Sequence, residues 1–217
     1  MLKLIGLLGG TFNPIHFGHL RLAQELANNL HFDEVRFIPS ANPPHKTIPV
    51  VSASHRARMV EIAIAGNSLF KSDTQELMRP GASYTIDTLI SIRAEIGDAA
   101  SLCLIMGSDA FTNLNTWHRW QELLDYCHII LVHRPNKTVA PDKLNLTLEL
   151  ETFLQENYTQ YCQDLSEYKA GFIHMQPITA HEISSTAIRE QFKQGQQPQY
   201  LMPIDVIEYI VKNNLYV

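Results

Sequence analysis

The stretch LKLIGLLGGTFNPIHFGHLRLAQELANNL, Leu2–Leu30, predicts the fold of the chain. It begins with an apolar run, Leu2–Leu8, that is typical of a buried strand and ends at two glycines. After a polar stretch, Gly18–Leu30 carries apolar residues three and four positions apart, which predicts an amphipathic helix. A buried strand followed closely by a helix is the repeating unit of α/β proteins.

The same alternation continues along the chain. Further strands are predicted over Glu34–Pro39, Thr74–Met78, Ser101–Met106, His128–His133 and Gly171–Met175. Further helices are predicted over Ser52–Ala65, Ser83–Ile96, Trp117–Leu124, Ser184–Gln194 and Pro203–Lys212. We therefore expect an α/β fold with a Rossmann-like parallel sheet flanked by helices, in the strand order 3-2-1-4-5-6. In this order the first and fourth strands are neighbours, and ligands bind beyond their carboxyl ends.

Length and composition narrow the class of protein. The chain has 217 residues, 45% of them hydrophobic and 18% charged, which fits one globular domain over residues 1–217. Within it, residues 134–169 are expected to form a helical excursion or a flap, and residues 198–217 a C-terminal helix. A net charge of −5 provides no extended basic field, so we expect no nucleic-acid partner.

Cysteine usage and apolar runs indicate the compartment. Cys103, Cys127 and Cys162 are far apart and fit no CxxC spacing, which favours a reducing environment without disulfides. No apolar run approaches the ~18 residues of a membrane span, and the start of the chain fails the criteria for a signal peptide. We therefore expect a cytoplasmic protein that does not act on membranes.

Histidines are the unusual feature: five of the ten fall within the first 55 residues. In GGTFNPIHFGHL, Gly9–Leu20, the glycines lack both the dinucleotide-binding and the P-loop spacing. His16 and His19 lie three apart at a predicted helix N-terminus, where free N–H groups attract phosphate. Their rings could donate to phosphoryl oxygens, although a single such histidine is more often a packing residue. No histidine pair has metalloenzyme spacing, so we expect no metal bound by the protein itself.

A second segment, ISSTAIR at Ile183–Arg189, also opens a predicted helix. Ser184 or Ser185 is the expected N-cap, and Arg189 stands one turn into the helix. Hydroxyl groups, free N–H groups and a guanidinium fork suit a polyphosphate, whereas simple capping is the commoner use of such a pattern.

Taken together, GGTFNPIHFGH and ISSTAIR resemble the T/HxGH and ISSTxIR signatures of the nucleotidyltransferase superfamily. The fuller form of the first resembles that of the bacterial nicotinate mononucleotide adenylyltransferases. The resemblance implies transfer of AMP from ATP to nicotinate mononucleotide, giving nicotinate adenine dinucleotide and pyrophosphate, with Mg²⁺ arriving on ATP.

Further blocks extend this resemblance along the chain. They are NPPHK at Asn42–Lys46, GASYTIDT at Gly81–Thr88, MGSDAF at Met106–Phe111, TWHRW around Trp117, and His133–Pro135. From the residues alone, Asp109 suits a ribose hydroxyl or a helix cap, and Trp117 suits a planar ring or the core. The free amides near Tyr84 and Thr85 suit a carboxylate.

The resemblance implies three groups of site residues. The catalytic group is His16, His19, Lys46 and Arg189. The ATP-binding group is Gly9, Gly10, Thr11, Phe12, Asn13, Gly18, Gly107, Asp109, Ile183, Ser184, Ser185 and Thr186. The mononucleotide-binding group is His45, Tyr84, Thr85, Trp117 and Arg134.

Several alternatives stay open at this stage. A nicotinamide-mononucleotide-preferring enzyme or a pantetheine-phosphate adenylyltransferase would share both signatures. A non-catalytic nucleotide-sensing domain would share the fold but is expected to lose one of them. A metal-dependent hydrolase built on the histidines would act without ATP.

Overall fold

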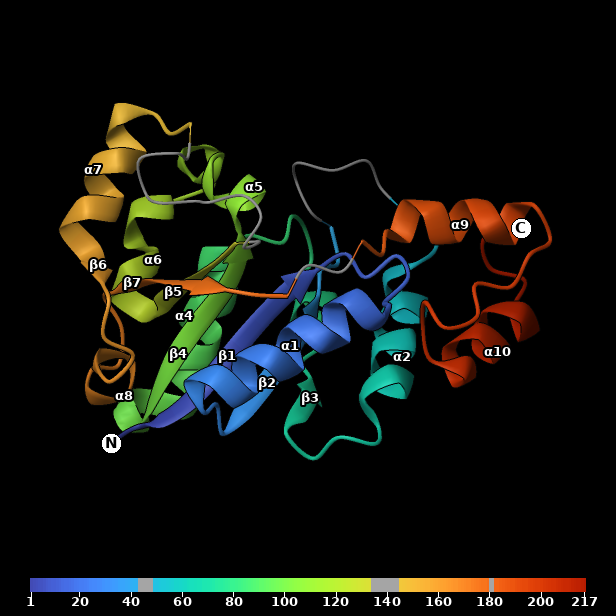
Figure 1. The fold of residues 1–217 in the computed structure, drawn as a ribbon, viewed down its shortest axis with the longest axis horizontal. Helices are drawn as coiled ribbons and strands as arrows, with labels where there is room; N and C mark the ends of the chain where they lie inside the picture. Colours follow the sequence, from blue (N-terminus) through green and yellow to red (C-terminus); the bar gives the residue numbers. More distant parts are fainter. Residues whose placement is uncertain (43–48, 134–144, 180–181) are drawn as a thin grey trace. The chain divides into compact units, whose positions relative to one another are not determined.

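The computed structural model describes residues 1–42, 49–133, 145–179 and 182–217 (Figure 1). Its strands are β1 (Lys3–Gly10), β2 (Glu34–Pro39), β3 (Phe70–Ser72), β4 (Ala100–Gly107), β5 (His128–His133), β6 (Tyr158–Thr159) and β7 (Ile173–Pro177). Its α-helices are α1 (Phe17–Leu30), α2 (Ala53–Ile64), α3 (Gln75–Met78), α4 (Thr85–Ile96), α5 (Ser108–Phe111), α6 (Leu123–Tyr126), α7 (Leu148–Asn157), α8 (Asp164–Glu167), α9 (Ser185–Lys193) and α10 (Ile204–Lys212). Three short 3₁₀ helices are η1 (Gly97–Ala99), η2 (Leu114–Thr116) and η3 (Trp120–Glu122).

The described strands form one sheet in the order β3-β2-β1-β4-β5-β7-β6. β1 pairs with β4 in parallel, with Leu7 opposite Leu104, and β4 pairs with β5 in parallel. Seven consecutive residues of β4, Ala100–Met106, are buried, as expected for a strand covered on both faces. The predicted Rossmann-like class and the adjacency of the first and fourth strands are confirmed.

The described chain divides into two compact units. Unit 1 comprises Met1–Leu8, Glu25–Val35 and Tyr84–Ala180, and unit 2 comprises Gly9–Gln24, Arg36–Ser83 and His181–Val217. In unit 1, β4, β5 and β7 lie side by side (Figure 1). In unit 2, α2 packs against α10. No helix of the described ranges is long and apolar enough to cross a membrane.

One predicted strand is wrong. The third strand is the shorter β3, Phe70–Ser72, and the predicted segment Thr74–Met78 contains helix α3 instead. Asp73 explains the change of direction, because its carboxylate accepts the backbone N–H of Gln75 at 3.2 Å and starts a turn.

Most other elements lie within one or two residues of their predicted bounds, and the larger differences are in the second half of the chain. The predicted strand Gly171–Met175 is observed as β7, two residues later, and the two-residue strand β6 extends the sheet beyond it. Between Trp117 and Leu124 the 3₁₀ helix η3 begins at Trp120, directly after Arg119 with its left-handed backbone (φ 52°), and the α-helix α6 begins only at Leu123. In the excursion predicted at 134–169, the described residues from 145 onward form α7, β6 and α8.

Candidate active site

The first signature begins at Gly9, so its two glycines are the last two residues of β1. Phe12 then takes a left-handed backbone conformation, with φ 45°, and buries its ring. A Cβ on Gly10 would lie 3.0 Å from that ring, so a side chain at this position would crowd it. The ring also meets the edge of His19 at a centroid distance of 5.1 Å.

His16 and His19 are brought together at the start of α1. The carbonyl of His16 accepts the backbone N–H groups of His19 and Leu20, at 3.0 and 3.3 Å. Their imidazole rings stack with centroids 3.8 Å apart and planes 25° apart. The backbone N–H of His16 donates to Nδ1 of His19 at 3.3 Å. Nδ1 is therefore an acceptor, and the neutral His19 ring carries its proton on Nε2.

His16 is only 6% exposed, and burial lowers the pKa of its imidazole to about 4. The ring is therefore neutral near pH 7. Its Nδ1 is buried without a hydrogen-bond partner among the described residues. A buried polar atom left unpaired in this way is costly, which makes it a candidate contact for a ligand.

Gly18 lies against the His16 ring. A Cβ at this position would be 3.0 Å from Nδ1 and Cε1 of His16 and 3.6 Å from Cβ of Ile183. The sequence assigned the glycine of HFGH to close approach by a ligand. In the structure the close neighbours are His16 and a residue of the second signature.

The second signature contacts the first through two side chains. Ser185, the first residue of α9, donates from Oγ to the carbonyl of Pro14 at 3.0 Å. Arg189 donates to the carbonyl of Asn13 at 2.9 Å and to Oγ1 of Thr186 at 3.2 Å. Two of the five guanidinium N–H groups are thus engaged within the described chain.

The expected capping by a serine is only half right. Ser184 occupies the N-cap position of α9, but its side chain makes no capping hydrogen bond. Ser184 and Thr186 are exposed, and Ser185 is half-buried. Because the first N–H groups of a helix have no partner within it, the start of α9 retains donors that suit an anion.

Sequence reasoning missed Arg56. This residue of α2 is 1% exposed, and its guanidinium donates to the carbonyls of Thr11, Ala41 and Val51 at 2.6, 3.3 and 3.3 Å. Burial lowers the pKa of Arg56. Arg56 lies three residues before the apolar Met59, which places both on the same face of the helix. This spacing was the sequence feature from which the burial of Arg56 could have been predicted.

The NPPHK block is described only at its first residue. The backbone N–H of Asn42 donates to Oγ of Ser83 at 3.2 Å, and its carbonyl accepts the N–H of Ser83 at 3.0 Å. Its side chain donates to the carbonyl of Gly81 at 3.1 Å. The block is thereby tied to the GASY segment. His45 and Lys46 lie outside the described residues.

The remaining predicted residues belong to unit 1. Gly107 is the N-cap of α5, so Asp109 does not cap the helix. The Asp109 side chain is exposed, and its carboxylate has no hydrogen bond to the described chain. Arg134 lies outside the described residues.

The two tryptophans of TWHRW, Trp117 and Trp120, differ in burial. Trp120 is buried and meets the ring of Phe153 edge-on, at a centroid distance of 4.9 Å, which makes it a core residue. Trp117 is half-buried and follows η2. Tyr84 is the N-cap of α4 but makes no side-chain capping bond, and its ring lies 4.5 Å from that of His118. The amides that open α4 are thus not capped by the Tyr84 side chain.

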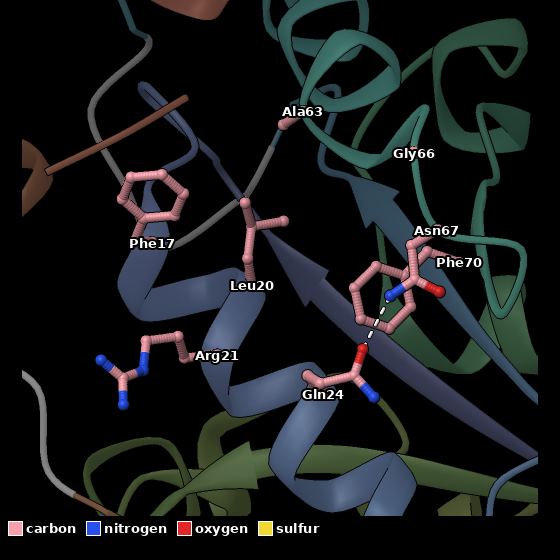
Figure 2. Close-up of a pocket in the computed structure, with 8 residues that line it drawn as sticks. All are labelled: Phe17, Leu20, Arg21, Gln24, Ala63, Gly66, Asn67 and Phe70. Carbon is pink, nitrogen blue, oxygen red and sulfur yellow. Dashed lines mark hydrogen bonds between the residues drawn. The ribbon is translucent and has the colours of Figure 1, made fainter. Parts of the chain in front are cut away.

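A separate pocket of unit 2 contains none of the predicted residues (Figure 2). It is lined by Phe17, Leu20, Arg21, Gln24, Ala63, Gly66, Asn67 and Phe70. Nδ2 of Asn67 donates to Oε1 of Gln24 across the pocket, at 2.7 Å. Among the described residues, no group of three or more His, Cys, Asp or Glu side chains could hold a metal ion.

Residues 7–191 match the model of the cytidylyltransferase-like family. A protein from Hydrogenovibrio crunogenus described as "Probable nicotinate-nucleotide adenylyltransferase" is 42% identical over 214 residues, which cover 99% of this chain and 98% of that one. A protein of the same description from Pseudomonas aeruginosa is 41% identical over 216 residues, covering 99% and 97%.

Solved structures share the fold. The nicotinic acid mononucleotide adenylyltransferase of Plasmodium falciparum complexed with NaAD superposes with a TM-score of 0.70 at 19% identity, covering 99% of this chain and 97% of that one. The same enzyme complexed with APC gives a TM-score of 0.68 at 18% identity, with the same coverage.

Proposed function

The chain belongs to the nicotinate-nucleotide adenylyltransferases of the cytidylyltransferase-like family, and we propose that its two signature segments bind ATP and guide adenylyl transfer to nicotinate mononucleotide. The observation that carries the proposal is the contact between the signatures. Arg189 and Ser185 of the second hold the carbonyls of Asn13 and Pro14 in the first.

The reaction is a displacement at phosphorus. An oxygen of the mononucleotide's 5′-phosphate attacks the α-phosphorus of ATP, the bond to the β-phosphate bridging oxygen breaks, and pyrophosphate leaves. A phosphate monoester is already ionised near pH 7, so the attacking oxygen needs no general base. Catalysis then rests on positioning and on stabilising the charge of the transition state.

His16 and His19 suit the transferring phosphate. In neutral His19 the proton lies on Nε2, because Nδ1 accepts the backbone N–H of His16. His16 offers a neutral ring whose Nδ1 lacks a partner in the described chain. Donors fixed in advance stabilise a developing charge without reorganising during the reaction.

The polyphosphate is assigned to the start of α9. Ser184–Thr186 supply hydroxyl and amide donors, Arg189 supplies its remaining N–H groups, and Lys46 supplies a further cation. The backbone of Gly9–Asn13, with Gly18 and Ile183, completes the ATP site. Mg²⁺ enters as the substrate complex MgATP and balances charge on the phosphates.

The acceptor is assigned to residues outside the two signatures. Trp117 stacks on the pyridine ring, and the amides around Tyr84 and Thr85 receive its carboxylate. His45 and Arg134 bind the mononucleotide, whereas Gly107 and Asp109 contact the nucleotide of ATP. A carboxylate at open helix amides favours nicotinate over nicotinamide, because an uncharged amide gains less from a helix N-terminus.

One assay tests the proposed function. Pyrophosphate release from MgATP is measured with nicotinate mononucleotide, nicotinamide mononucleotide and 4′-phosphopantetheine as parallel acceptors. We expect the highest kcat/KM with the nicotinate form. A higher kcat/KM with either rival acceptor would replace the proposed substrate, and pyrophosphate release without any acceptor would indicate a hydrolase.

A further inference from the structure

Tyr216 reaches back to the first signature from the end of unit 2. Its hydroxyl donates to Oδ1 of Asn13 at 2.7 Å, across 203 residues of sequence. No motif marks either the tyrosine or this contact. The contact is specific in direction, because a phenol that donates to Oδ1 fixes which end of the amide faces it.

The ring of Tyr216 is itself held in place. It stacks on the buried Phe192 of α9, with centroids 6.2 Å apart and planes 27° apart. The backbone of Tyr216 is left-handed, with φ 66°, as is that of Asn214, with φ 49°. Side-chain-bearing residues adopt this conformation at a cost, so it persists where the surroundings maintain it.

The Tyr216 hydroxyl also stays protonated, so it acts as a hydrogen-bond donor. The guanidinium groups of Arg56 and Arg189 favour the phenolate, but burial outweighs them and raises the pKa of Tyr216. The hydroxyl therefore keeps its proton at neutral pH, and Oδ1 of Asn13 is the acceptor.

Side chains from α2 and α9 also donate hydrogen bonds to backbone carbonyls of the same loop. Arg56 holds the carbonyl of Thr11, Arg189 holds the carbonyl of Asn13, and Ser185 holds the carbonyl of Pro14. These three bonds fix the backbone, whereas the bond from Tyr216 fixes the side chain of Asn13.

We propose that Tyr216 is a positioning residue of the reaction, which anchors the loop at Thr11–Pro14 through the side chain of Asn13 and thereby sets the place of His16. This rests on the proposed function of the loop in binding ATP. Asn13 then serves as an anchor through its side-chain oxygen, and ATP meets the backbone of the loop.

The first test removes the hydroxyl alone. Tyr216→Phe is expected to weaken ATP binding about five- to tenfold, the loss of one hydrogen bond, and to lower kcat/KM for ATP by at least as much. The matched control is Tyr209→Phe, which removes a hydroxyl that bonds Nδ1 of His55 at 2.8 Å in the same unit. It should leave both quantities unchanged. Wild-type ATP affinity and kcat in Tyr216→Phe would overturn the proposal.

The second test separates an anchor from a ligand. Ala removes the acceptor oxygen of Asn13. As an anchor, Asn13→Ala should weaken ATP affinity by the same factor as Tyr216→Phe, because each variant removes the same hydrogen bond. A side chain that contacted ATP directly would lose more with Ala than Tyr216→Phe does.

The double variant with both Tyr216→Phe and Asn13→Ala completes a double-mutant cycle. If the two groups act as one unit, Tyr216→Phe should have no further effect in the Asn13→Ala background. Independent, multiplied losses would contradict the proposal. ATP affinity is measured by titration calorimetry without an acceptor, so the result stands apart from the acceptor assay that tests the proposed function. Thermal melts of every variant identify losses that come from unfolding.

Discussion

The backbone N–H of His16 donates to Nδ1 of His19 at 3.3 Å, while the two imidazole rings stack 3.8 Å apart. One histidine thus sets the tautomer of the other. His16 is held neutral by burial, and the proton of neutral His19 is placed on Nε2. Because His16 is neutral, the stacked pair does not carry two positive charges side by side.

Removing the His19 ring should affect turnover far more than binding. We expect His19→Ala to lower kcat about 10²–10³-fold, the usual loss for one transition-state donor, with ATP affinity largely kept. The amide of Gln reaches about as far as Nε2, whereas that of Asn reaches about as far as Nδ1. His19→Gln should therefore recover more kcat than His19→Asn. Wild-type turnover in His19→Ala would show that the ring does not act on the transition state.

Gly18 should tolerate no side chain. A Cβ there would lie 3.0 Å from the buried ring of His16, so Gly18→Ala must displace that ring or the helix start. We expect a loss of ~1–3 kcal/mol in the free energy of unfolding, as for other overpacked sites, together with a lower kcat. Urea denaturation and steady-state kinetics measure both. Gly66→Ala, where a Cβ would meet nothing within 4 Å, is the control and should keep kcat. Equal behaviour of the two variants would argue against the predicted crowding.

The sequence predicted the sheet well where apolar runs are continuous. β5 was placed at its observed bounds, and β4 within one residue of them. The prediction failed at Thr74–Met78, because a turn started by the side chain of Asp73 overrides the apolar pattern. It also missed β6, whose two residues are too few to show a period.

The candidate site could be read from the sequence where its residues lie in one motif, as for His16 and His19, whose rings the structure places in contact. The sequence did not predict the contacts of Arg56 and Tyr216, because these contacts join residues 45 and 203 positions apart. No local pattern encodes such contacts. Only the packing of unit 2 brings these two side chains to the loop.

His16 should make stability depend on pH between its unfolded and folded pKa values. The ordinary value is 6.5 and the folded value is about 4, so in this window the unfolded chain binds the proton first. The free energy of unfolding therefore falls as pH drops from 6.5 towards 4, by about 2–3 kcal/mol from this group at pH 4.5. His16→Asn should lose correspondingly less stability over the same range in urea denaturation.

The exposed His31 provides the comparison for that measurement. Its backbone is left-handed, with φ 56°, and Asn accepts this conformation, so His31→Asn should fold normally. We expect its pH dependence to match that of wild type. If His16→Asn also matched wild type, the buried imidazole would not be the group that titrates.

The two tryptophans should separate binding from stability. Trp117 is half-buried and assigned to the pyridine ring, so Trp117→Ala should raise KM for nicotinate mononucleotide about tenfold or more, since a stacked aromatic contributes ~1–3 kcal/mol. KM for ATP should change little. Trp120 packs on Phe153 in the core, so Trp120→Ala should lower the free energy of unfolding by ~3–5 kcal/mol. Kinetics with each substrate varied in turn, together with urea denaturation, distinguish the two. Equal changes in both KM values for Trp117→Ala would assign that residue to packing, because a stacking partner of the acceptor has no reason to affect ATP.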